Sequence, residues 1–108
     1  MEELAESIAI LGKEGVETVI VSSGAVGLGM GKLAIKERPK DLSLLRACAS
    51  IGQCRLMNAW SHSLEKAGLV ASQVLLTRAD FESRTRSKKV EETLSALLKQ
   101  KVIPIVNE

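Results

Sequence analysis

Aromatic residues are nearly absent from this sequence. Trp60 and Phe81 alone make up its 2% aromatic content, whereas 45% of the 108 residues are hydrophobic. Any core must therefore be aliphatic, which suits a layered α/β protein better than a β-sandwich. The same scarcity argues against a stacking surface for single-stranded nucleic acid. A formal charge of +2 is also too small to indicate a nucleic-acid partner.

Cysteine and histidine are scarce as well. Cys48 and Cys54 lie six positions apart in a segment predicted to be helical, so they face different directions and fit neither a disulfide nor a metal knuckle. His62 is the only histidine, and no metal site is predicted. We find no signal peptide and no apolar run long enough to span a membrane. These absences lead us to expect a reduced, cytoplasmic protein without a membrane partner.

The spacing of apolar residues predicts helices and strands in alternation within a single domain. The predicted order is helix 2–13, strand 18–22, helix 43–66, strand 69–76, helix 90–100 and strand 102–106. Segment 24–41 is predicted as a glycine-rich turn and a polar loop, and segment 77–89 as a charged connection. Alternation of this kind is typical of parallel strands joined by right-handed crossovers. The predicted fold class is therefore α/β with a mainly parallel sheet.

Polar residues follow each predicted strand. They are Ser22-Ser23-Gly24 after the first strand, Thr77-Arg78 after the second and Asn107-Glu108 after the third. In α/β sheets the ligand crevice lies at the carboxyl ends of the strands. These three positions are therefore the first candidates for a binding site.

Four glycines are packed into the eight positions from Gly24 to Gly31. The segment fails the Walker pattern, since Leu33 follows Gly31-Lys32 where Ser or Thr is required. It also fails the dinucleotide pattern, which would need a glycine at Lys32 or Ala34. A glycine-rich turn can offer consecutive backbone N–H groups to an anion, and a serine before it adds a hydroxyl. The alternative is a tight strand-to-helix turn that only needs a positive φ.

Four stretches carry a closer resemblance: "VIVSSGAVGLG", "ASIGQCRLMNAW", "SQVLLTRADFESRTR" and "VIPIVNE". In this order and spacing the chain resembles the glutamate 5-kinase family of amino-acid kinases from about residue 4 to residue 108. The "GQxRL" and "QVLLTRAD" stretches are its more specific parts. The resemblance implies a three-layer α/β/α fold and ATP-dependent phosphorylation of the L-glutamate γ-carboxylate, the first step of proline biosynthesis. It also implies Mg²⁺ on the ATP phosphates and a homo-oligomer.

The resemblance assigns roles to individual residues. Ser23, Gly24 and Ala25 match the loop that holds the substrate amino acid and faces the phosphoryl group, and Asn107 matches an asparagine that hydrogen-bonds the glutamate. The alternatives to these binding roles are structural: Ser23 lies in a turn at the end of a strand, and Asn107 is a turn-forming asparagine. Gln53 and Arg55 match supports near the site or a subunit contact.

Parts of the family pattern fall outside these residues. The lysine that contacts the ATP phosphates is expected before residue 1, and an acidic residue and the nucleotide-binding half after residue 108. We therefore expect residues 1–108 to be a partial kinase domain, incomplete at both ends and inactive alone, with its catalytic residues unknown. Within the chain, "SKKVE" at 87–91 replaces an aromatic-Leu-Asn-Ala-Arg stretch, so no role is carried over there.

Two other functions stay open. One is a non-catalytic α/β fragment that binds a small anion or a partner chain. The other is a different amino-acid kinase, such as one for N-acetylglutamate. The "GQCRL" and "LLTRADFESR" stretches argue against this second alternative, by resemblance only.

Overall fold

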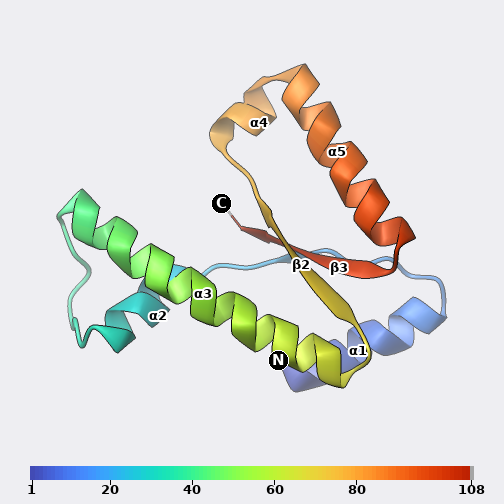
Figure 1. Ribbon diagram of the computed structural model, residues 1–108, viewed down its shortest axis with the longest axis horizontal. Helices are drawn as coiled ribbons and strands as arrows, with labels where there is room; N and C mark the ends of the chain where they lie inside the picture. The colour runs from blue at the N-terminus through green and yellow to red at the C-terminus, as the bar shows by residue number, and fades with distance from the viewer. Residues whose placement is uncertain (108) are drawn as a thin grey trace. The chain divides into compact units, whose positions relative to one another are not determined.

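The computed structural model describes residues 1–107, which form helices and parallel strands in alternation (Figure 1). In chain order the elements are α1 (Glu2–Lys13), β1 (Ile20–Val21), α2 (Ala25–Lys32), α3 (Leu42–Lys66), β2 (Val70–Leu75), α4 (Arg78–Glu82), α5 (Arg84–Lys99) and β3 (Val102–Asn107). The chain forms two compact units, one of Met1–Ser22 with the chain from Ser61 onward, the other of Ser23–Trp60.

The first unit contains a parallel sheet in the order β1-β3-β2. Its register pairs Val21 with Val106 and Leu75 with Asn107. Strand β3 lies in the middle and carries the most buried run of the chain, residues 103–106, as an aliphatic strand flanked on both edges should. The parallel α/β sheet predicted from the alternation is confirmed.

Helices cover the sheet because parallel strands need crossover connections. The chain runs from β1 past β3 to β2 and then returns to β3, so its two crossovers run in opposite directions. Right-handed crossovers then place α5 and the last turns of α3, from Ser61 on, on opposite faces of the sheet. Helix α1 buries Ala5 and Ile8, and its Glu2 forms an ion pair of 2.8 Å with Lys66 at the end of α3. The result is the predicted three-layer α/β/α arrangement.

The second unit consists of α2, the polar segment 33–41 and the first part of α3. The start of α3 is fixed by Asp41, whose carboxylate accepts a hydrogen bond of 3.2 Å from the Ser43 N–H, and Asp is a preferred residue at a helix N-cap. Its core is small, because the buried positions are Gly29 on α2 and Cys48, Gly52, Leu56 and Trp60 on α3.

Three local predictions were wrong. Residues 25–32 are helical, not a glycine-rich turn, and residues 77–89, predicted as a charged connection, contain α4 and the start of α5. Strand β1 has two residues in place of the predicted 18–22. It is an edge strand of the described sheet, and Val21 is 81% exposed although the run 18–22 is mostly apolar.

Candidate functional site

The carboxyl ends of the three strands lie side by side in the first unit. The Ser22 N–H donates a hydrogen bond of 3.0 Å to the Val106 carbonyl, and the Leu76 N–H donates one of 3.0 Å to the Asn107 carbonyl. These bonds continue the parallel ladder by one residue beyond β1 and β2. Asn107, half-buried at the end of the central strand, therefore lies between the ends of the two outer strands.

Thr77, which follows β2, caps helix α4 instead of facing an open crevice. Its backbone N–H and its hydroxyl donate to the Asp80 carboxylate, at 2.7 and 3.1 Å. The Thr77 backbone hydrogen bond lowers the pKa of Asp80, with a smaller contribution from the Arg86 charge. Asp80 is thus held ionised as a capping group. Apolar spacing did not predict this helix, although Thr-x-x-Asp after a strand is a recognisable capping pattern.

Ser23, Gly24 and Ala25 lie in the second unit, at the start of α2. Gly24 is the N-cap residue with φ +105° and ψ +4°, and no side chain caps this helix end. The first turn carries no acidic residue either. The first N–H groups of a helix have no partner within the helix, and they carry the positive end of its dipole. Ser23 and Gly24 are exposed, so this end is accessible to an anion.

The other glycines of the segment do not form the backbone concavity that their spacing suggested. Gly27, Gly29 and Gly31 are inside α2, and only Gly24 among the four has a positive φ. Anion-binding N–H groups are therefore confined to the first turn of the helix.

Other charged or polar residues singled out in the sequence have separate positions. Gln53 is half-buried and Arg55 exposed on α3, and His62 is exposed on the same helix. The arginines of segment 78–86 are exposed, which is the arrangement expected of a solvated loop or helix end. The "SKKVE" stretch lies within α5.

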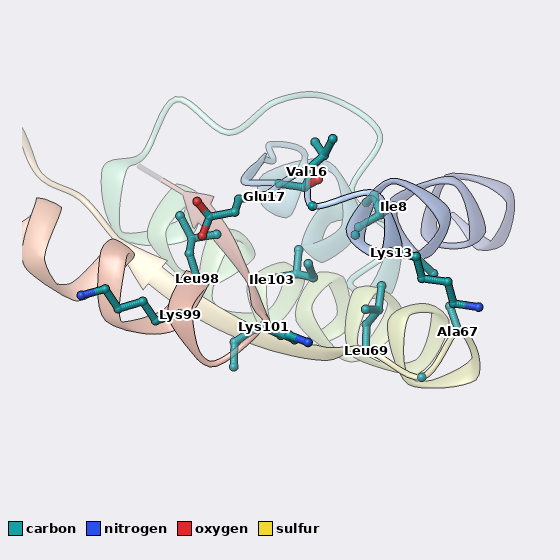
Figure 2. Close-up of a pocket in the computed structure, with 16 residues that line it drawn as sticks. Ile8, Lys13, Val16, Glu17, Ala67, Leu69, Leu98, Lys99, Lys101 and Ile103 are labelled. Carbon is teal, nitrogen blue, oxygen red and sulfur yellow. The ribbon is translucent and has the colours of Figure 1, made fainter.

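A pocket of about 490 Å³ lies elsewhere in the first unit (Figure 2). It is lined by the end of α1, residues 15–18, residues 67–69, the end of α5 and the start of β3. Figure 2 shows Ile103 and Leu98 near its centre, whereas the ammonium groups of Lys13 and Lys99 extend away from it. Because this pocket lies at the amino ends of β2 and β3, it is separate from the strand ends that carry Asn107.

Residues 1–107 contain no group of three or more His, Cys, Asp or Glu side chains arranged to hold a metal ion. None of the helices described for this chain has the length and apolar character needed to cross a membrane.

Comparison with known proteins identifies the family of this chain. The sequence matches the model of the amino acid kinase family over residues 1–108. It is 47% identical to a glutamate 5-kinase of Thermus thermophilus, covering 100% of this chain and 29% of that protein. It is 43% identical to one of Clostridium acetobutylicum, covering 100% and 40%, and 45% identical to one of Caldanaerobacter subterraneus, covering 100% and 29%. The chain thus spans well under half of these relatives.

Proposed function

Because this chain belongs to the amino acid kinase family, we propose that the protein carrying it transfers a phosphoryl group from ATP to the γ-carboxylate of L-glutamate. The product is γ-glutamyl phosphate, the first intermediate of proline biosynthesis. The observation that carries the proposal is the 43–47% identity to glutamate 5-kinases over every residue of the chain. Residues 1–108 supply the glutamate-binding part of the domain in this proposal.

The start of α2 binds the anionic part of the reaction. Phosphoryl transfer depends mainly on positioning and on stabilising negative charge at the transferring group. The uncapped first-turn N–H groups after Gly24 supply such stabilisation without reorganising, and the Ser23 hydroxyl adds a donor. No side-chain carboxylate in this turn competes with the ligand.

Asn107 orients the glutamate. Its side-chain amide has both a donor and an acceptor, which match the carboxylate and the ammonium group of an amino acid. Its place at the end of the central strand gives it a fixed backbone, because β3 is paired on both sides. Ser23 and Asn107 are thus proposed as binding residues, and neither is proposed as a base.

ATP enters as the phosphoryl donor of the family's reaction. Among the described residues no three His, Cys, Asp or Glu side chains are grouped to hold a metal ion, and no step is assigned to a metal held by this chain. We further propose that the protein is cytoplasmic, since both cysteines of this chain, Cys48 and Cys54, are free thiols. A homo-oligomer is proposed from the family likeness, and light scattering on the purified protein tests it.

The test is ADP release by the purified full-length gene product, with L-glutamate, with N-acetyl-L-glutamate and with neither. ADP release that depends on L-glutamate supports the proposal. Release only with N-acetyl-L-glutamate would show that the protein is an N-acetylglutamate kinase instead. No release with either substrate would favour a non-catalytic role.

The site assignment is tested with Ser23→Ala. We expect kcat/KM for L-glutamate to fall by about tenfold or more, the size of a lost charge-assisted hydrogen bond of about 1.5–3 kcal/mol. Ser50→Ala is the control, because that exposed hydroxyl only bonds the Ala47 carbonyl of its own helix. Equal kinetics for the two variants would remove Ser23 from the site.

A further inference from the structure

Helices α2 and α3 meet backbone to backbone at two buried glycines, Gly29 and Gly52. A methyl group added at Gly29 would lie 2.7 Å from the Cα of Cys48 and closer still to its carbonyl group. A methyl group at Gly52 would lie 2.9 Å from the Gly29 nitrogen and closer still to the Ala25 carbonyl group. Real Cβ atoms essentially never come within 3.0 Å of such atoms, so both positions exclude any side chain.

The neighbouring glycines show that this is a specific contact. Gly27 and Gly31 lie two residues to either side of Gly29, and an added methyl group would have no atom within 4 Å at either position. With 3.6 residues per turn, positions two apart point to nearly opposite sides of a helix. Gly29 therefore faces α3, whereas Gly27 and Gly31 face away from it.

The contact reaches the candidate loop itself. Ala25 is the first residue of α2 and follows directly on the N-cap Gly24. Gly52 thus touches the turn whose N–H groups are the proposed anion donors, and it does so from a helix of 25 residues. A methyl group at Gly52 therefore fits only if α2 and α3 move apart at this point.

We propose that Gly52 is a positioning residue, which together with Gly29 on α2 fixes the position of the Ser23–Ala25 loop relative to α3. Its lack of a side chain lets the first turn of α2 lie directly on the α3 backbone, so the loop's donors have one fixed position. This inference rests on the proposed function only for its catalytic consequence; the structural consequence stands independently of the ligand. A misplacement of about 1 Å can lower the rate of an enzyme on the order of 100-fold.

The experiment compares Gly52→Ala with Gly31→Ala in the full-length gene product, because Gly31 lies in the last turn of α2, away from the proposed donors, and has open space around it. The first readout is hydrogen–deuterium exchange of the segment 23–31, which requires no substrate. We expect exchange there to be at least about tenfold faster in Gly52→Ala than in Gly31→Ala, with a smaller change in β3, because the disturbance is local. Equal exchange of segment 23–31 in the two folded variants would overturn the proposal.

The second readout is the kinetics with L-glutamate. A variant that is merely less stable has fewer active molecules, which lowers kcat and leaves KM unchanged. A displaced loop instead lowers kcat/KM for L-glutamate per folded molecule, by about tenfold or more in Gly52→Ala and not in Gly31→Ala. A value of kcat/KM per folded molecule in Gly52→Ala equal to that of Gly31→Ala contradicts the positioning role. A wild-type protein without glutamate-dependent turnover contradicts the proposed function, and the exchange experiment then decides the inference alone.

A milder variant covers the case in which Gly52→Ala does not fold. Cys48 is fully buried, and its backbone contacts Gly29. Cys48→Val enlarges a side chain beside the contact without placing a methyl group between the two backbones. We expect faster exchange of segment 23–31 than in Gly31→Ala, by roughly two- to fivefold. If segment 23–31 of Cys48→Val exchanged at the wild-type rate, that result would contradict the proposal.

Discussion

Replacing Gly24 with alanine should destabilise the protein through backbone strain alone. Gly24 has φ +105° and ψ +4°, well beyond the left-handed helical region near φ +57°. A residue with a Cβ pays about 1–2 kcal/mol to enter that region and about 1–3 kcal/mol in sparsely populated ones. An added Cβ at Gly24 would have no atom within 4 Å, so no steric clash contributes.

The net loss is smaller than the strain. Alanine also restricts the unfolded chain, which returns about 0.4–1 kcal/mol to stability. With strain of about 2 kcal/mol, the free energy of unfolding should fall by about 1.5 kcal/mol, or roughly tenfold in the folding equilibrium. For a urea m-value of about 1–3 kcal/mol/M, the midpoint should drop by roughly 0.5–1.5 M.

The assay is urea unfolding of the purified protein, followed by far-ultraviolet circular dichroism. Gly27→Ala is the matched control, since Gly27 has helical φ and open space around it. Because alanine is the better helix former, this variant should gain a few tenths to about 1 kcal/mol. The two midpoints should therefore move in opposite directions. A Gly24→Ala midpoint equal to or above that of Gly27→Ala would refute the assignment of Gly24 as a left-handed N-cap.

Three further predictions concern the first unit. Ile105→Ala should cost about 2–5 kcal/mol in urea titrations, because the side chain is 1% exposed in the central strand; a loss under about 1 kcal/mol would contradict this burial. In Lys66→Ala the pKa of Glu2 should rise to its ordinary range, because the hydrogen bond from Lys66 is the main cause of the lowered pKa. NMR titration measures this change. The thermal midpoint should hardly change, since both partners are exposed. The Asp80 cap should be complete above about pH 4 and lost as pH falls through the lowered pKa. The Thr77 amide shift should follow that transition in the wild type and not in Asp80→Asn.

Most helices and strands, and the parallel direction of the strands, could be predicted because their signals are local. Helix α1 keeps its apolar residues at helical spacing and ends close to the predicted residue, and β3 is a short aliphatic run. The strand-end rule placed the residues after the three strands at one edge of the sheet, and the hydrogen bonds from Ser22 to Val106 and from Leu76 to Asn107 confirm this. The binding roles of Ser23 and Asn107 stay predictions.

The helices α2 and α4 were missed for different reasons. Glycine has the poorest helix propensity after proline, so three glycines in the eight residues of α2 predict a loop. Tertiary contact with α3 overrides that preference. Helix α4 has five residues and depends on the Thr77–Asp80 capping box, which a search for apolar periodicity does not detect.

The four glycines from Gly24 to Gly31 share one residue type but not one physical role. Gly24 adopts a positive φ, and Gly29 permits a backbone contact with Cys48. Gly27 and Gly31 have neither a positive φ nor such a contact. Composition cannot separate these roles, because conformation at Gly24 is set locally whereas contact at Gly29 depends on a residue 19 positions away. A single alanine series separates them: strain at Gly24, overlap at Gly29 and improved helix propensity at the other two. If all four alanine variants lost similar stability, the segment would be a glycine-dependent loop, and the contact between α2 and α3 would not be the reason for its composition.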